Sequence, residues 1–216
     1  TLEASSPDGA PFDVSTQVTA SDSCGPVSLT ESPVPTNYPL GSTVVTVTAA
    51  DGSGNSASDT VTVTVVDTIA PDLAVTVTPT ILWPPNHNRI PINWTYRVSD
   101  IGDPSPSVEL VLVQSVEGDG VDTFDPAFDV TEIVGRKGGD IQLVDGQLYL
   151  RAERAGNGDG RVYTMTFQAT DASGNSSEAT ATVFVPHHQY LSAMRSRVRW
   201  HRAPPPLSKR SLVRRR

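Results

Sequence analysis

Alternation of apolar and polar residues is the dominant pattern in the first 188 positions of the chain. The stretch T-V-T-V-T-V-V at 60–66 places its first three valines on one side and its threonines on the other. V-Y-T-M-T-F-Q-A-T at 162–170 and A-T-A-T-V-F-V at 179–185 repeat this pattern. Such alternation of β-branched and aromatic residues is typical of strands with one buried face, and 1–188 shows no sustained helical period. The pattern predicts an all-β chain.

Two nearly identical hexapeptides follow alternating stretches, D-G-S-G-N-S at 51–56 and D-A-S-G-N-S at 171–176. An aspartate at the head of a turn accepts hydrogen bonds from the backbone two residues on, and glycine and asparagine tolerate positive φ. More alternating sequence comes after each hexapeptide. Each is therefore predicted to be a hairpin turn between two adjacent antiparallel strands.

The chain also repeats on a larger scale. A-S-D-S-C-G-P at 20–26 parallels V-S-D-I-G-D-P at 98–104, and each precedes one of the hexapeptides. The repeat predicts two tandem immunoglobulin-like antiparallel β-sandwiches, the second enlarged by an insertion. The predicted organisation is a sandwich over 1–68, a larger sandwich over 69–188 with its insertion near 112–160, and a tail over 189–216. Pro71, in the segment D-T-I-A-P-D, is expected to stiffen the joint.

The motifs of the first sandwich resemble those of a known family. S-D-S-C-G-P at 21–26, Y-P-L-G-S-T-V-V-T-V-T-A-A-D-G-S-G-N-S-A at 38–57 and T-V-T-V-V-D-T-I-A-P at 62–71 are similar to the hyalin repeat, or HYR domain. The resemblance implies an immunoglobulin-like extracellular module associated with adhesion. Animal hyalin repeats usually carry paired cysteines, and a copy with Cys24 alone is more similar to bacterial surface versions.

The second predicted sandwich resembles a domain that accompanies such repeats. Its motifs are L-W-P-P-N-H-N at 82–88, L-R-A-E-R-A-G-N-G-D-G-R-V-Y-T at 150–164 and V-P-H at 185–187. They are similar to those of an immunoglobulin-like or cadherin-like β-sandwich of bacterial secreted or surface proteins. This resemblance implies no defined activity.

Charge is unevenly distributed along the chain, whose formal net charge is −8. Residues 1–67 carry 8 acidic and no basic side chains, so the folded part is expected to repel nucleic acid and anionic lipid. Cys24 is the only cysteine, which excludes an intrachain disulfide. No apolar run approaches the length of a membrane span. The chain begins at Thr1 inside an apparent strand and is expected to be part of a larger multidomain protein.

Five aspartates are predicted to meet where the chain enters the second sandwich, because the loops at 98–104 and 171–176 return to that end. They are Asp67, Asp72, Asp100, Asp103 and Asp171. Cadherins bind calcium with acids at such joints, and A-T-D at 169–171 is similar to their A-x-D strand end. The D-I-G-D here departs from their D-x-D. Calcium takes six to eight oxygen ligands, so the alternatives are a calcium-stiffened joint and solvated turn acids. No other cofactor is predicted.

Other candidate residues have structural as well as functional interpretations. His87 is expected near His187 and His188 at the opposite end of the second sandwich. There they could bind zinc or copper, or they could cap and pack a proline-rich loop. Tyr163, near the start of a predicted strand, suits a tyrosine corner, in which the hydroxyl bonds to nearby backbone.

Nothing in the sequence singles out a catalytic centre. A Ser-His-Asp arrangement has few histidines to draw on, and there is no G-x-S-x-G elbow. Cys24 has no histidine near it in sequence, and no phosphate-cradling loop, zinc-type cysteine spacing or EF-hand occurs. The 24 acidic residues contain no pair that stands out as a glycosidase centre. The sequence predicts a protein that is not an enzyme.

The tail at 189–216 breaks from the rest in composition, with 9 Lys or Arg residues and no acid. It could bind anionic polymers, fold back on the acidic body, or be the product of a reading-frame slip. Its composition predicts disorder.

Together these observations predict a secreted or cell-surface structural or adhesion module, acting as a stiff spacer or as an interaction domain for extracellular protein or glycan. A rival hypothesis is a glycan- or protein-binding accessory domain of a secreted hydrolase, with a ligand face on the insertion. The insertion offers that face only Phe124, Phe128 and Tyr149 as aromatic residues.

Overall fold

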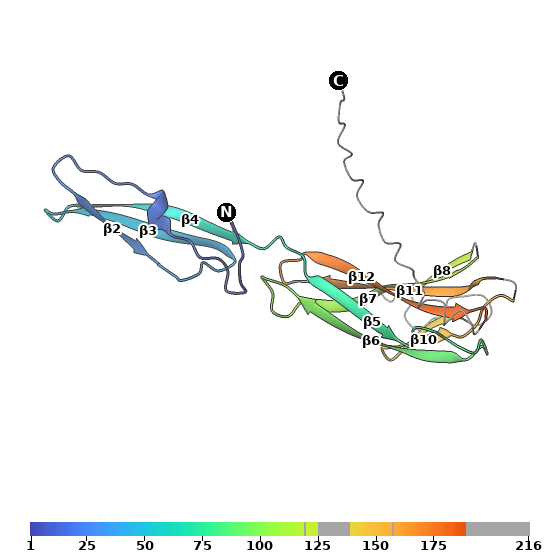
Figure 1. The fold of residues 1–216 in the computed structure, drawn as a ribbon. Helices are drawn as coiled ribbons and strands as arrows, with labels where there is room; N and C mark the ends of the chain where they lie inside the picture. The colour runs from blue at the N-terminus through green and yellow to red at the C-terminus, as the bar shows by residue number, and fades with distance from the viewer. Residues whose placement is uncertain (119, 125–138, 157, 189–216) are drawn as a thin grey trace, which may run out of the picture.

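The structure, a computed structural model, describes residues 1–118, 120–124, 139–156 and 158–188. These residues form β-strands and one short 3-10 helix, which confirms the all-β prediction. The predicted tail at 189–216 and part of the predicted insertion lie outside the described residues. Figure 1 shows two units arranged end to end, one over residues 1–66 and the other over 72–188, here called the first and second units.

The first unit contains one four-stranded sheet with the order β1-β4-β3-β2. Its strands are β1 (Leu2–Glu3), β2 (Val27–Ser32), β3 (Gly41–Asp51) and β4 (Ser56–Val66). Strand β1 runs parallel to β4, and the other pairs are antiparallel. The threonine and valine alternation turns one face inward, where Val45, Val47, Val63 and Val65 are buried.

Irregular chain covers that buried face of the first sheet. Ala10 and Tyr38 exchange two backbone hydrogen bonds of 3.0 and 2.8 Å, and both side chains are buried. The 3-10 helix η1 (Val14–Gln17) begins where the Asp13 carboxylate accepts a bond from the Ser15 amide. The turn residues S-P-D-G and the prolines of S-P-V-P interrupt strand pairing here. The opposing layer therefore consists of an isolated bridge and a short helix.

Gly9 is required where this irregular layer turns. Its φ is +100°, and a Cβ added there would lie 1.9 Å from the Tyr38 carbonyl oxygen. We expect Gly9→Ala to lower the free energy of unfolding of the first unit by about 2 kcal/mol or more, because the bridge must move. Gly54→Ala is the matched control, since Gly54 has φ +90° with open space around it. Equal losses by chemical denaturation in both variants would contradict the steric explanation.

The second unit is built from two packed antiparallel sheets. The order of one is β5-β6-β10-β9, and that of the other is β12-β11-β7-β8. The first comprises β5 (Asp72–Thr78), β6 (Arg89–Ser99), β10 (Gln147–Arg151) and β9 (Ile141–Val144). The second comprises β12 (Ser176–Pro186), β11 (Gly160–Thr170), β7 (Ser107–Glu117) and β8 (Gly120–Phe124). Strands β8, β9 and β10 lie within the predicted insertion and extend both sheets.

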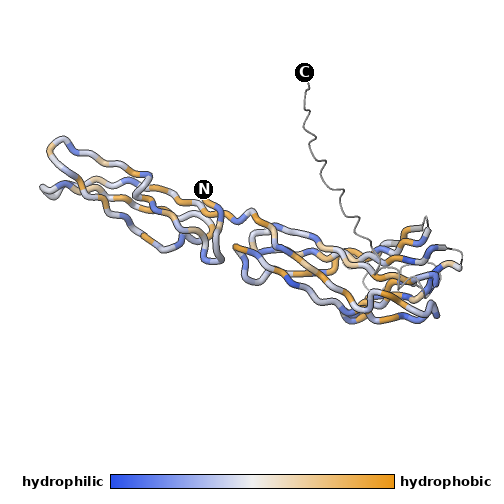
Figure 2. Tube along the Cα trace, in the orientation of Figure 1, coloured by the Kyte–Doolittle hydropathy of each residue, from blue (hydrophilic) through white to orange (hydrophobic). Residues whose placement is uncertain are grey.

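The core of the second unit lies between these sheets. Along β11, Tyr163, Met165, Phe167 and Ala169 alternate inward and have no exposed surface. The Trp94 ring of β6 packs against Phe167 with 5.7 Å between ring centroids. Figure 2 shows the apolar positions running along the strands of both units. The buried residues of the two cores have no member in common.

Candidate functional site

The joint between the units comprises the linker Asp67–Pro71 and the loops at 100–106 and 171–175 of the second unit. On the first-unit side, the Thr68 amide and hydroxyl donate to the Glu3 carboxylate at 2.6 and 3.1 Å. On the other side, the Asn175 side-chain amide donates to the Asp67 carbonyl at 3.0 Å, and the Ser177 hydroxyl donates to the Pro71 carbonyl. The linker is thus hydrogen-bonded to both units.

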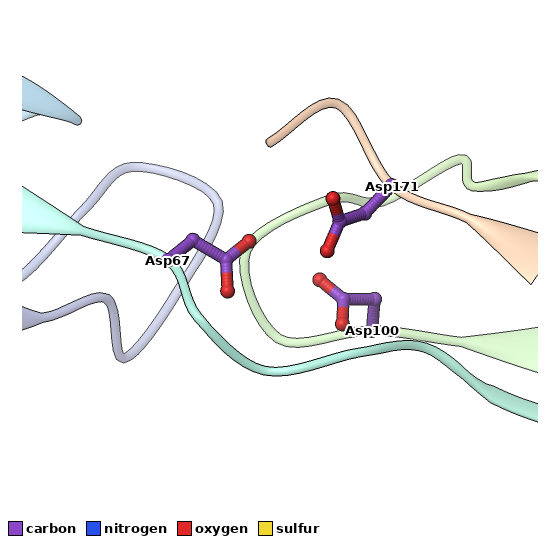
Figure 3. Close-up of side chains that lie close together, drawn as sticks. All are labelled: Asp67, Asp100 and Asp171. Atoms are coloured by element: carbon purple, nitrogen blue, oxygen red, sulfur yellow. The ribbon is translucent and has the colours of Figure 1, made fainter. Parts of the chain in front are cut away.

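Three aspartates converge at the joint, as Figure 3 shows. Asp67 follows β4, Asp100 follows β6 and Asp171 follows β11, so three separate segments supply them. Each offers a carboxylate oxygen that lies within 4.8 Å of the other two. Among the described residues, this is the one group of three or more potential His, Cys, Asp or Glu metal ligands.

Asp171 is held by the turn that it begins. The Asn175 backbone amide donates to Asp171 Oδ1 and its side-chain amide to Oδ2, both at 2.8 Å. Burial raises the pKa of Asp171, but the hydrogen bonds from Asn175, Ser173 and Gly174 outweigh burial and leave the pKa below its ordinary value. The carboxylate, in a residue only 7% exposed, therefore stays ionised at neutral pH.

Asp100 brings an oxygen without a partner to the same place. Its Oδ1 accepts 2.8 Å bonds from the Gly102 and Asp103 amides. Its Oδ2 is shielded from solvent and has no hydrogen-bond partner among the described residues. A Cβ at Gly102 would lie 2.2 Å from Asp67 Oδ2. The loop backbone therefore packs directly against the linker carboxylate.

The other two predicted ligands are placed differently. Asp103 uses both oxygens within the loops, accepting from the Ser105 amide at 2.8 Å and from the Ala172 amide at 2.9 Å. Asp72 begins β5, is exposed, and lines with Asp100 a neighbouring hollow of about 290 Å³. The structure therefore brings three of the five aspartates together, while Asp103 joins the two loops and Asp72 lies outside the group.

Three carboxylates this close repel one another, and a cation between them would remove that repulsion. Hard divalent cations such as calcium prefer carboxylate and carbonyl oxygens, and Asp100 Oδ2 has an unused lone pair. Asp67, Asp100 and Asp171 fit the donor set of such an ion. Cation binding is a chemistry that this donor set can support.

Sequence reasoning did not identify the groups that hold the linker. Asn175, Ser173 and Ser177 all contact linker residues, the Ser173 hydroxyl donating to Asp67 Oδ2 at 3.4 Å. Two of them belong to the D-A-S-G-N-S hexapeptide, of which the sequence pattern singles out only the turn and the Asp171 carboxylate. Asn175 was the one available signal in the sequence, because a turn asparagine carries a side-chain amide that can donate to a neighbouring segment.

A model of the HYR domain family matches residues 11–65, which extend from just before η1 through most of β4. This confirms the resemblance to a hyalin repeat, and HYR domains are extracellular modules of the adhesion type, not enzymes. No curated protein matches the chain. The second unit, with its two packed antiparallel sheets, is consistent with an immunoglobulin-like domain after the HYR domain.

A buried charged cluster lies at the end of the second unit that is farther from the HYR domain. The Arg161 guanidinium pairs with Glu117 at 2.7 Å and with Asp140, which is 2% exposed. Burial lowers the pKa of Arg161, but hydrogen bonds to Glu117 and Tyr163 raise it above its ordinary value. For Asp140, burial outweighs the attraction of Arg161 and raises the pKa. The cluster joins β7, β11 and the segment before β9.

Tyr163 and the histidines complete this end of the second unit. The Tyr163 hydroxyl donates to the Arg151 carbonyl at 2.8 Å, which confirms the predicted bond to backbone, and burial raises its pKa to about 12. His87 Nδ1 lies 3.3 Å from Glu153, whereas His187 contacts His188 at 2.8 Å. Among the described residues, the histidines do not form a three-ligand metal group.

The aromatic residues of the predicted insertion do not form a ligand face in the described part of the structure. Phe124 is fully buried in the core, and Tyr149 is partly buried on β10. Phe128 lies outside the described residues.

The described ranges also contain no helix long and apolar enough to cross a membrane.

Proposed function

We propose that this chain is a non-catalytic spacer of a secreted or surface-displayed protein, in which the HYR domain and the second unit are held in a fixed relative orientation. The HYR match supports the extracellular adhesion class. The doubly anchored linker is the observation that carries the spacer function, because a free linker would let the units swing. Interaction with extracellular protein or glycan would take place through the modules that the spacer connects.

The strands give this spacer its length. β4, β11 and β12 each contain 11 residues, and Figure 1 shows them lying roughly along the long direction of the two units. At about 3.3 Å per residue, such a strand spans roughly 36 Å. Load applied along the long direction therefore meets long antiparallel ladders, with the linker as the softest segment between them.

A divalent cation at the joint is the second part of the proposal, with calcium as the ion. Asp67 belongs to the linker, whereas Asp100 and Asp171 belong to loops of the second unit. An ion that binds all three oxygens would link the linker to the loops of the second unit and would stiffen the joint further. Extracellular modules bind calcium with Kd values of about 10⁻⁴–10⁻³ M. Calcium at extracellular concentrations can therefore occupy a site of this strength.

Calcium titration tests the joint site. We expect calorimetric binding to one site, and calcium at about 100 times Kd should raise the free energy of unfolding by about 2.7 kcal/mol. Asp100→Asn should weaken binding about tenfold or more, because it removes a ligand charge. Asp72→Asn is the matched control: it changes charge equally but lies outside the three-aspartate group. The absence of a calcium effect in the unmodified chain, or equal weakening in both variants, would contradict the site.

A further inference from the structure

The two hexapeptide turns have the same internal geometry in both units. Asn55 donates from its backbone amide to Asp51 Oδ1 at 2.8 Å and from its side-chain amide to Oδ2 at 2.7 Å. Asn175 makes the same two bonds to Asp171, both at 2.8 Å. Gly54 and Gly174 both donate to the carbonyl of the turn aspartate at 3.3 Å. The asparagine amide is thus oriented identically in the two turns.

In the described part of the chain, the second-unit turn holds a linker and the first-unit turn does not. There the Asn175 side-chain amide bonds both to the Asp171 carboxylate and to the Asp67 carbonyl. Among the described residues, the Asn55 side-chain amide donates only to Asp51. Exposure follows this difference, since Asn55 is exposed and Asn175 is partly buried. The first unit therefore presents a turn with the same geometry and a donor that remains free.

The surroundings of the free turn also correspond to the joint. Asp22 accepts from the Cys24 amide at 2.6 Å, as Asp100 accepts from the Gly102 amide at 2.8 Å. Asp22, Asp51 and Asn55 line one hollow of about 210 Å³ at the end of the first unit. Two carboxylates and a free amide thus occupy the positions that Asp100, Asp171 and Asn175 occupy around the linker.

We propose that this end of the first unit is a docking surface for the linker of another unit of the same kind. The docked segment is an extended stretch like Asp67–Pro71, whose aspartate carbonyl accepts a hydrogen bond from the free Asn55 side-chain amide, as the Asp67 carbonyl accepts one from Asn175. The proposal extends the proposed spacer function to a third unit and depends on the linker contacts, not on the cation. In the first unit, Gly25 takes the place of Asp103 and Ala57 the place of Ser177. The new joint therefore lacks the bond that Asp103 accepts from Ala172 and the bond that Ser177 donates to the linker.

The strand registers show where a second linker should be joined to the chain so that it reaches the Asn55 turn. Leu2 pairs in parallel with Val65, 10 positions after Asn55, and Ile81 pairs in parallel with Phe184, 9 positions after Asn175. Leu2 therefore corresponds closely to Leu82. Joining a copy of residues 66–80 ahead of Thr1 places the copied aspartate 15 positions before Leu2, the interval that separates Asp67 from Leu82.

Side-chain amide exchange, measured by NMR on this extended chain, tests the docking. We expect the Asn55 side-chain amide to shift and to exchange at least about fivefold more slowly, because tethering supplies a high effective concentration of linker. An extension of equal length made of Gly and Ser is the control and should leave Asn55 unchanged. Asn55→Ala should abolish the slowed amide exchange of the copied linker, and Asn175→Ala should leave the exchange of the copied linker slow.

The result also separates this proposal from the proposed spacer function. If Asn175 is protected and Asn55 behaves alike with both extensions, the docking proposal is overturned while the internal joint stands. If the Asn175 amide is itself unprotected in the unmodified chain, the internal joint is absent, and both proposals fail. Slowed exchange of Asn55 with the copied linker alone supports a joint that any unit of this kind can form.

Discussion

Replacing Arg161 by methionine is expected to lower the free energy of unfolding of the second unit by about 3–5 kcal/mol. Arg161 is 8% exposed and neutralises Asp140, which is 2% exposed. Methionine fills a similar volume but leaves the buried Asp140 carboxyl without its ion-pair partner. Removing one partner of a buried pair costs far more than the pair contributes, because the remaining charge cannot reach water.

The loss should depend on pH in a direction set by Asp140. Its folded-state pKa is raised by burial, and removal of Arg161 raises it further, because the guanidinium opposes the effect of burial. A carboxyl with a raised folded-state pKa destabilises the fold as pH rises through that pKa, and the penalty disappears below the unfolded-state pKa. The difference between Arg161→Met and the unmodified chain should therefore be large near pH 7 and should shrink towards about pH 4.

The matched control replaces both members of the buried pair. Arg161→Met combined with Asp140→Leu removes the more deeply buried of the two carboxylates that lose Arg161, while Glu117 keeps some contact with solvent. The double variant should recover most of the lost stability at neutral pH, since apolar residues often substitute well for buried ion pairs. Chemical denaturation of the three chains at both pH values measures the effect. A loss that is independent of pH and is not recovered in the double variant would assign the effect to packing by the Arg161 stem.

Local patterns predicted the strands and turns well because their causes are local. Period-two alternation gives β11 its buried face from Tyr163 to Ala169, and Asp171 bonds to backbone within its own turn. The irregular layer of the first unit was less apparent, because its core contacts come from the isolated residues Ala10 and Tyr38. Those two residues show no period and meet only in the folded chain.

The joint was predicted in outline, and its details depend on distances that sequence does not encode. The convergence of acids follows from loops returning to one end of a sandwich, but which oxygens meet depends on the loop conformations. Asp103 turns its carboxylate to the Ala172 amide 69 positions away. Arg161 lies on the inward face by period, yet its partner Glu117 is 44 positions away, so its burial could not be inferred from local sequence.

Phe167→Ala is expected to destabilise the second unit by about 3–5 kcal/mol and to leave the first unit unchanged. Phe167 is fully buried at the centre of β11 against Trp94, and truncation leaves a cavity that rigid strands cannot close. The melting temperature of the second unit should fall by roughly 10–20 °C. Among the described residues, the two cores have no member in common, so the defect should stay within the second unit.

Trp fluorescence separates the two transitions, because Trp83, Trp94 and Trp200 all lie outside the first unit. Tyr38→Ala is the reciprocal variant, because Tyr38 is 1% exposed in the core of the first unit. The melting temperature of the first unit, followed by circular dichroism, should fall, while the fluorescence transition of the second unit should stay in place. A fluorescence transition that moves with Tyr38→Ala would mean that the joint couples the units into one cooperative body. If the transitions stay separate, each unit stores its own stability. A spacer of this kind then lengthens under load by one unfolding unit at a time, while the folded neighbour keeps its surface.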